Sequence, residues 1–313
     1  MEVIKGIEHI NVQDDSAVCI GNFDGLHLGH RLILATLEEQ SEKKGLKSII
    51  FTFEPHPFKF FNKDIKLIST PKKREEKFLA QKIDYLISAD FNSSLSQLSA
   101  ESFFKDIIVD KLKAKVVIVG DDYRFGSGKG GDTNLLIELG KKYNVEIIVA
   151  EKLQDNKGNI ISSSRIRSLI IDGNVEEVAK LLKCPYSLEG IVIHGDKRGR
   201  KIGYPTINLD VVNEVLPANG VYASKVIIKN KIYNSMAYVG YIPTINNNME
   251  LRVEANIFEF NEDVYGEYAE IILYKHMRDD IKFNSIVSLI DQMGEDKAKV
   301  MAYLNHVDEY NIC

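Results

Sequence analysis

The stretch Ala17–His30, AVCIGNFDGLHLGH, joins a short apolar run to the start of an amphipathic segment. The apolar run has the length and composition of a buried parallel strand. The segment that follows, Arg31–Lys44, places Ile33, Leu34 and Leu37 on one helical face and ends in two lysines before Gly45, as helices commonly do. This junction therefore predicts a strand that turns through glycines into a helix.

The first half of the chain repeats this alternation of apolar runs and amphipathic stretches. Such an alternation predicts a doubly wound parallel sheet, whose ligands bind at the carboxyl ends of the strands. The expected strands are Ala17–Phe23, Lys47–Phe53, Asp84–Ala89, Lys115–Gly120 and Val145–Ala150. The expected helices between them are Arg31–Lys44, Pro71–Lys82, Ser99–Leu112 and Asp132–Tyr143.

The second half changes character after a helical pattern over Val175–Lys183. Strand patterns then follow one another with tight turns and no helix between them, which predicts an antiparallel β-barrel. One helix over Ser285–Tyr303 is expected to close the chain. The sequence thus predicts two domains, residues 1–184 and 185–313. The expected strands are Tyr186–His194, Gly220–Lys229, Lys231–Val239, Leu251–Phe260 and Ala269–Lys275.

Composition limits the classes of function. Among 313 residues, Lys and Arg total 40 and Asp and Glu total 45, so the net charge is −5 and bulk charge does not favour a nucleic-acid partner. No apolar run approaches the ~20 residues that cross a membrane, and no apolar leader opens the chain. Three scattered cysteines do not indicate a disulfide framework. We therefore expect a cytoplasmic protein that acts on small molecules; the oligomeric state is left open.

The two histidines at the first strand–helix junction predict a phosphate site. The free N–H groups of a helix start attract phosphate, and His27 and His30 are spaced to face one ligand. Their N–H groups can bind phosphates, and protonated rings would also balance developing charge. Gly21 permits a tight turn, and Gly29 leaves room for a ligand. The alternative is an ordinary helix start capped by Asp24.

Three other segments of the first half end or follow expected strands. Glu54–Pro57 is either a binding loop or a rigid proline loop. The Asp121–Gly131 loop combines cations with glycines, which suits a polyanion or an aromatic ring, although a flexible turn is the alternative. The hydroxyls of Ser162–Ser164 could bind a ligand or cap a helix, and Arg165 and Arg167 can clamp phosphate oxygens.

A basic glycine-rich loop, Gly195–Gly203, follows the first strand of the second half. Its glycines let backbone N–H groups approach phosphates, although it is not a Walker A loop. Thr206 and Asn208 alternate in an extended chain, so they face one side, where a hydroxyl and an amide oxygen can complete a Mg²⁺ shell with nucleotide phosphates. The alternative is a solvated basic hairpin loop.

Several of these segments together carry a family resemblance. His27–His30 resembles the HxGH signature of nucleotidyltransferases, and the wider Gly21–His30 resembles that of the prokaryotic bifunctional riboflavin kinase/FAD synthetases. Phe51–Pro57, Gly120–Gly126 and Ile161–Arg167 resemble further segments of that family, in the same order. The resemblance implies a nucleotidyltransferase domain followed by a riboflavin kinase barrel.

The kinase module is recognised by Pro205–Asn208, which resembles its PTAN segment with Ile207 in place of alanine. Glu254 matches the catalytic carboxylate of that module, which would accept the proton of the ribityl hydroxyl. Two positions depart from the pattern. Asn256 stands where the family often has histidine, and Ile242, in the Val239–Thr244 segment, precedes the proline where an arginine is often found.

The resemblance implies that ATP phosphorylates riboflavin to FMN, and that a second ATP adenylylates FMN to FAD with release of pyrophosphate. Mg²⁺ would accompany ATP, while FMN and FAD would be substrate and product. One alternative keeps only FMN adenylyl transfer, with a weakened kinase. Another makes the second domain a flavin-binding regulatory module, although such a binder needs neither the metal ligands nor Glu254.

The resemblance also implies roles for individual residues. The catalytic residues would be His27, His30, Arg165 and Glu254, and the metal ligands Thr206 and Asn208. The nucleotide and phosphate contacts would come from Gly21, Asn22, Phe23, Asp24, Gly29, Ser163, Ser164, Arg167, Gly195, Gly199, Arg200 and Gly203. The flavin contacts would come from Phe53, His56, Pro57, Asp121, Tyr123, Arg124, Phe125, Arg278 and Phe283.

Overall fold

The computed structural model describes residues 1–196, 198–243 and 249–307, and it divides into two compact units, Met1–Ser162 and Ser163–Cys313. The division lies before the expected boundary at residue 184, because two helices, α7 (Ser163–Ile171) and α8 (Val175–Leu182), pack together and α8 contacts the barrel. The functional boundary stays a prediction.

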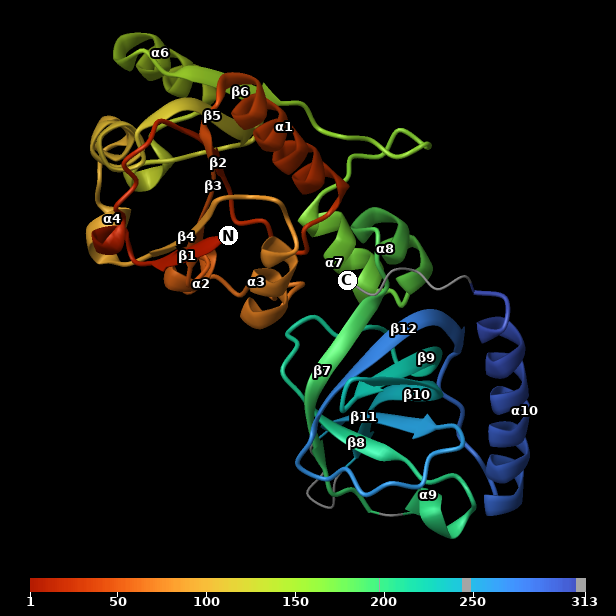
Figure 1. The fold of residues 1–313 in the computed structure, drawn as a ribbon. Helices are drawn as coiled ribbons and strands as arrows, with labels where there is room; N and C mark the ends of the chain where they lie inside the picture. Colours follow the sequence, from red (N-terminus) through yellow and green to blue (C-terminus); the bar gives the residue numbers. More distant parts are fainter. Residues whose placement is uncertain (197, 244–248, 308–313) are drawn as a thin grey trace. The chain divides into compact units, whose positions relative to one another are not determined.

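The first unit is built on a parallel sheet with the strand order β1-β4-β3-β2-β5-β6 (Figure 1). All five expected strands are present, which confirms the parallel sheet. An additional edge strand was not expected because it is short and mostly exposed. The strands are β1 (Glu2–Lys5), β2 (Ser16–Ile20), β3 (Lys47–Glu54), β4 (Tyr85–Asp90), β5 (Ala114–Gly120) and β6 (Glu146–Ala150).

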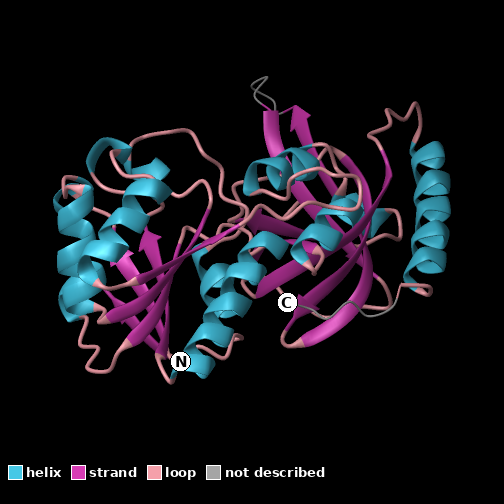
Figure 2. Ribbon diagram, turned by 90° about the horizontal axis from the view of Figure 1, so that it is seen from above, coloured by secondary structure: helices cyan, strands magenta, loops and turns pink. Residues whose placement is uncertain are grey.

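Helices cover both faces of this sheet (Figure 2). Because side chains alternate along a strand, Ala17 and Cys19 of β2 pack with α1 (Leu28–Lys44) and α3 (Pro71–Leu79), whereas Val18 and Ile20 pack on the opposite side. That opposite side is covered by a π-helical segment, η2 (Phe103–Lys111), and by α6 (Thr133–Tyr143). Short helices α2 (Pro57–Phe60), α4 (Ser93–Ser96) and α5 (Ala100–Ser102) complete the unit, with single turns at η1 (Ile7–His9) and η3 (Ser127–Lys129).

Strand β2 lies where the chain changes direction across the sheet. It pairs with β3 on one side and with β5 on the other, and the connections lead outward from both. In open parallel sheets such a reversal leaves a crevice at the carboxyl ends of the strands, where ligands bind. The β2–α1 junction, with its two histidines, begins at this point.

The second unit contains a closed antiparallel barrel in the order β10-β11-β8-β7-β12-β9, which confirms the expected barrel (Figure 1). Lys229 and Asn230 both have positive φ and form the tight turn of the hairpin between β9 and β10. The closing helix α10 (Ile286–Leu304) buries Val300 and Leu304 against the barrel. The strands are β7 (Tyr186–Ile193), β8 (Ile207–Val211), β9 (Gly220–Ile228), β10 (Lys231–Pro243), β11 (Met249–Ile257) and β12 (Tyr268–Arg278), and α9 spans Arg198–Lys201.

Two further observations bear on the sequence-based expectations. Among the described residues, none of the helices is long and apolar enough to cross a membrane. Cys19 is free and buried.

Helix α1 provides a direct test of the core of the first unit. Leu37 is 0% exposed and Leu32, on the same helix, is 42% exposed. We expect Leu37→Ala to lower the free energy of unfolding by about 2–5 kcal/mol through lost burial and an internal cavity. The matched variant Leu32→Ala should change it by roughly 0.5 kcal/mol or less. Urea unfolding followed by circular dichroism measures both; equal effects would contradict this placement of α1.

Candidate active sites

His27 forms the cap of α1. Its Nδ1 accepts the backbone N–H of His30 at 3.3 Å, and the two imidazole rings stack with their centroids 3.6 Å apart. A Cβ on Gly29 would lie 3.1 Å from Cε1 of His27, so the glycine makes room for this ring rather than only for a ligand. Because Nδ1 accepts, the proton of the neutral His27 imidazole lies on Nε2.

The buried Phe23 ring packs against the histidine pair. Phe23 is 1% exposed and meets the rings of His30 and Phe78 edge-on, at 5.3 and 5.7 Å between centroids. A Cβ on Gly21 would approach the Phe23 ring to 3.1 Å. In this structure Phe23 therefore orients His30, and the buried carboxylate of Asp24 accepts backbone N–H groups of the loop before α3.

Three buried polar atoms near the carboxyl ends of β2 and β3 have no hydrogen-bond partner among the described residues: Asn22 Oδ1, His30 Nδ1 and Thr52 Oγ1. Buried polar groups are normally paired, so such atoms point to a ligand. Thr52 follows Phe51, whose carbonyl accepts the N–H of Gly21 at 3.2 Å. Sequence reasoning missed Thr52; its only signal was a hydroxyl inside an apolar strand.

Burial keeps both histidines neutral. It lowers the pKa of His27 to about 4, and it lowers the pKa of His30 well below the usual 6.5, with the His27 ring adding to the effect. Desolvation therefore favours the neutral imidazoles over the cations, and protonated rings that balance developing charge stay a prediction. The imidazoles can still donate hydrogen bonds to phosphate oxygens.

The segment after β3 is held by Arg74 of α3. The Arg74 guanidinium pairs with the Glu54 carboxylate and donates to the carbonyls of Phe53 and Asn22, both at 3.4 Å. His56 is buried and caps α2, because its Nδ1 accepts the N–H of Phe58 at 3.1 Å. These contacts fix the ends of β2 and β3 relative to α3.

Two of the flavin-contact candidates in this segment have evident structural roles. Phe53 is 9% exposed and packs against the rings of Phe51 and Phe91. Pro57 is the first residue of α2, where a missing N–H does no harm.

The Asp121–Gly131 loop follows β5 and is stiffened from within. The Tyr123 and Phe125 rings stack at 5.6 Å, and Phe125 pairs through its backbone with Gly131. Arg124 is exposed and Asp121 pairs with Lys152 at 3.4 Å. The loop thus presents an exposed guanidinium on a rigid aromatic base, beside the carboxyl end of β5.

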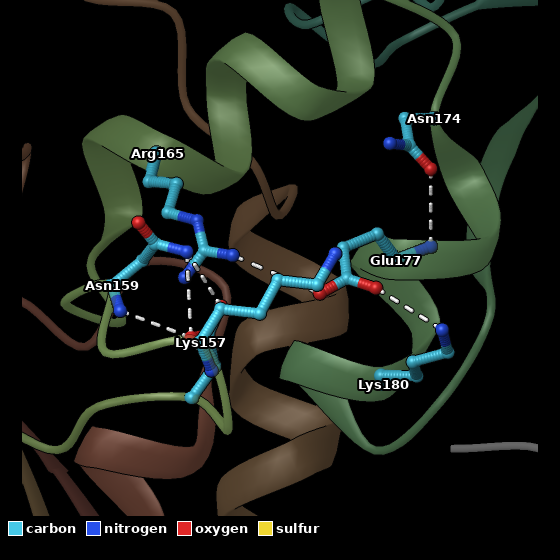
Figure 3. Close-up of polar contacts among 7 residues, drawn as sticks. Lys157, Asn159, Arg165, Asn174, Glu177 and Lys180 are labelled. Atoms are coloured by element: carbon cyan, nitrogen blue, oxygen red, sulfur yellow. Dashed lines mark hydrogen bonds and ion pairs between the residues drawn. The ribbon is translucent and has the colours of Figure 1, made fainter.

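Helix α7 carries the serines and arginines that the sequence predicts for phosphate. Ser163 and Ser164 are its first residues, and Arg167 lies one turn later. The Arg165 guanidinium meets the Glu177 carboxylate of α8 at 3.7 Å, and Lys180 meets the other Glu177 oxygen at 3.1 Å (Figure 3). Helix α7, with both arginines, belongs to the second compact unit.

In the barrel, three predicted residues meet at one point: Asn208 and Glu254 lie in paired strands, and Thr206 directly precedes β8. The Thr206 hydroxyl donates to Oε2 of Glu254 at 3.0 Å, and Glu254 of β11 lies directly opposite Asn208 of β8. Ile207 is buried and points the other way, as expected for a position that alternates with them. A Cβ on Gly195 would lie 2.3 Å from Asn208 Nδ2, so the glycine lets the loop pass close to this side chain.

Asn256, which replaces the family's usual histidine, supports this cluster. It is 6% exposed, and its Nδ2 donates to the carbonyl of Pro205 at 2.7 Å. The departure at position 256 therefore fixes the segment that carries Thr206. Of the other quoted residues, Ile242 lies in β10, whereas Lys197 and Thr244 fall outside the described residues.

The glycine loop of the barrel folds tightly. A Cβ on Gly199 would lie 2.2 Å from the carbonyl oxygen of Tyr204, and Gly203 has a φ of +86°. Both positions thus require glycine. Arg200 is exposed on the same loop, in α9.

Arg278, a candidate flavin contact, is engaged within the barrel unit. Its Nε and Nη2 donate to Oδ2 of Asp296 at 2.9 and 2.8 Å, and Asp296 is 3% exposed on α10. The Phe283 ring centroid lies 5.9 Å from the guanidinium carbon. The pair ties β12 to the closing helix, and the flavin contacts expected of Arg278 and Phe283 stay a prediction.

Comparisons with known proteins cover both units. A family model for FAD synthetase matches residues 9–165, and one for riboflavin kinase matches residues 182–304. A bifunctional riboflavin kinase/FMN adenylyltransferase from Buchnera aphidicola subsp. Schizaphis graminum is 38% identical, with 97% of this chain and 99% of that protein covered. The protein of the same name from Escherichia coli K12 is 33% identical, with 95% and 96% covered.

A solved structure is similar over most of the chain. A crystal structure of a protein from Streptococcus pneumoniae, described as a macrolide-efflux protein, has a TM-score of 0.86 and 36% identity. The comparison covers 96% of this chain and 99% of that one. Its name differs from those of the curated relatives, whereas its fold is the same.

The buried imidazole of His27 makes the stability of the first unit depend on pH. Its pKa is about 4 in the folded state against 6.5 ordinarily, so between these values the unfolded chain binds a proton that the folded chain does not. The free energy of unfolding should therefore fall by about 3 kcal/mol as pH drops from 6.5 to 4. Chemical denaturation across this range measures the fall.

Two variants isolate this contribution from the carboxylates that titrate nearby. His27→Gln should flatten part of the pH dependence, whereas the exposed His9→Gln should keep it. The assignment fails if the two variants show the same dependence as the parent.

Proposed function

The chain belongs to the family of bifunctional riboflavin kinase/FMN adenylyltransferases, and we propose on this basis that it converts riboflavin to FMN and FMN to FAD, each step with one ATP. The observation that supports the kinase step most directly is the meeting of Thr206, Asn208 and Glu254. A flavin-binding module without turnover would need no carboxylate beside two oxygen donors.

In the adenylylation step, a phosphate oxygen of FMN attacks the α-phosphorus of ATP, and the bond to pyrophosphate breaks. No covalent intermediate with the protein is needed, so the site acts by positioning and by stabilising charge. The start of α1 and the neutral imidazoles of His27 and His30 would donate to the phosphates. Asn22 and Thr52 would meet a ligand with side-chain oxygens that have no partner among the described residues.

In the kinase step, the ribityl 5′-hydroxyl attacks the γ-phosphorus of ATP and ADP leaves. Glu254 would accept the hydroxyl proton, while the glycine loop around Gly195 and Gly199 would hold phosphates with its backbone N–H groups. The hydrogen bond from Thr206 orients the carboxylate before substrate arrives.

The donor set beside Glu254 fits Mg²⁺. The Thr206 hydroxyl and the Asn208 amide are neutral oxygen donors, and no cluster of acidic, histidine or cysteine side chains able to bind a metal alone occurs among the described residues. Mg²⁺ is commonly held by few protein oxygens together with nucleotide phosphates. Bound there with ATP, it would neutralise phosphate charge.

Two narrower functions remain as alternatives: adenylyl transfer alone, or a second unit that only binds flavin. Chromatography of products, with riboflavin and FMN supplied separately, distinguishes them. The bifunctional proposal requires FMN to appear from riboflavin before FAD. FAD from FMN, with no FMN from riboflavin, would establish the narrower reading. We place the enzyme in the cytoplasm, where ATP is available, with small molecules as its partners.

His30→Ala tests the adenylylation site. We expect FAD formation from FMN to fall by ~10²-fold or more, the scale for loss of a preorganised hydrogen-bond donor. FMN formation from riboflavin should persist, because Glu254 and its neighbours lie in the other unit. His9→Ala, at an exposed position, is the matched control. A folded His30→Ala protein that makes FAD at the parent rate would remove His30 from the site.

Glu254→Gln tests the kinase site. The amide keeps the shape but cannot accept the proton, so we expect FMN formation to fall by about 10²–10⁴-fold while calorimetry still shows flavin and nucleotide binding. Thr206→Ala should weaken Mg-nucleotide binding as well as turnover. FAD formation from supplied FMN should survive in both, and the exposed Glu259→Gln serves as control. Parent-rate kinase activity in Glu254→Gln would show that Glu254 is not the base.

A further inference from the structure

The carboxylate of Glu254 is held on both oxygens. Thr206 donates to Oε2, and Nη1 of Arg252 lies 3.3 Å from Oε1. Arg252 and Glu254 are two residues apart on β11, so their side chains project from the same face of the barrel wall. The same Nη1 lies 3.1 Å from Oδ2 of Asp196, in the loop that follows β7.

We propose that Arg252 is a positioning residue for phosphoryl transfer, which couples the place of the glycine loop to the orientation of the Glu254 carboxylate. This inference rests on the proposed kinase function. Asp196 directly follows Gly195, the residue that crosses over Asn208. The Arg252 guanidinium therefore links Asp196 of the glycine loop to Glu254, the residue that would accept the proton.

The contact between Arg252 and Glu254 is shielded from water and leaves part of the carboxylate free to accept a proton. The Arg252 and Glu254 side chains are 20% and 21% exposed, so water screens this pair less than a surface ion pair. A carboxylate offers about four acceptor positions, so two hydrogen bonds leave room for the hydroxyl proton. Fixing a proton acceptor in one orientation is a recognised contribution to rate, and small misplacements of reacting groups are costly.

The contact between Asp196 and Arg252 connects the glycine loop to the arginine. The Asp196 side chain is 45% exposed, so the ion pair with Arg252 adds little to folding. It does, however, restrain the loop that would meet nucleotide phosphates. Removal of the Asp196 charge should therefore affect nucleotide binding, whereas removal of Arg252 should affect both nucleotide binding and the orientation of Glu254.

Steady-state kinetics of FMN formation tests the inference. We expect Arg252→Met to lower kcat by about 10-fold or more and to raise KM for ATP. Arg252→Lys should restore part of kcat, because an ammonium can reach Glu254 but lacks the planar fork. Asp196→Asn should raise KM for ATP several-fold and leave kcat close to the parent value. In the double variant, Asp196→Asn should add little to Arg252→Met.

Three comparisons keep the result interpretable. FAD formation from supplied FMN should stay at the parent rate in every variant, and Lys231→Met, at an exposed position on β10, should change neither constant. Parent-like kcat and KM in Arg252→Met, or fully additive effects in the double variant, would overturn the coupling. If Arg252→Met does not fold, the other two variants still test the inference. It then requires a lower kcat in Arg252→Lys and, in Asp196→Asn, a raised KM for ATP with kcat close to the parent value. A parent protein that makes no FMN would instead refute the kinase function itself.

Discussion

The burial of β2 on both faces is the constraint on which the first unit depends. All five of its residues are buried, so it must have a strand on each side and a helix layer on each face. With β3 on one side and β5 on the other, the chain has to reverse its direction across the sheet next to β2. The residue that leaves the strand at this reversal begins the turn to His27 and His30. The candidate site lies at the end of β2 because this fully buried strand occupies the middle of the sheet, where the chain reverses.

Strand register plays the equivalent role in the barrel. Glu254 and Asn208 are far apart in the sequence, and they meet because β11 pairs with β8 in antiparallel register. A shift of β11 by one residue would turn the Glu254 side chain to the other face of the sheet, away from Asn208. Buried Ile207 and Ala255, which occupy the opposite face, oppose such a shift. The Asn256 hydrogen bond to Pro205 adds a polar restraint on the same alignment.

The sequence predicted what periodicity and turn chemistry encode. Five strands of the sheet, the barrel and the closing helix follow from buried apolar runs and their connections. Strand β1 was missed because only one of its residues is buried, and β8 because it is short and follows a glycine loop. The pairing of Arg278 with Asp296 could not be predicted, because it depends on where α10 packs. The neutral state of His27 and His30 depends on how deeply the rings are buried. The spacing of the two histidines in the sequence does not indicate this burial.

The two candidate sites differ in the charge of their side chains: the histidines of the first are neutral, whereas the second pairs a carboxylate with an arginine. At the β2–α1 junction, burial removes the positive charge from His27 and His30, so phosphates would meet aligned N–H donors and a helix start. At the barrel site, Glu254 keeps an arginine against one oxygen and a hydroxyl against the other. The difference matches the two reactions. Attack by an FMN phosphate needs no base, because that oxygen already carries negative charge, whereas attack by a neutral ribityl hydroxyl must lose a proton. An ordered carboxylate is therefore useful only in the barrel, where the structure has one.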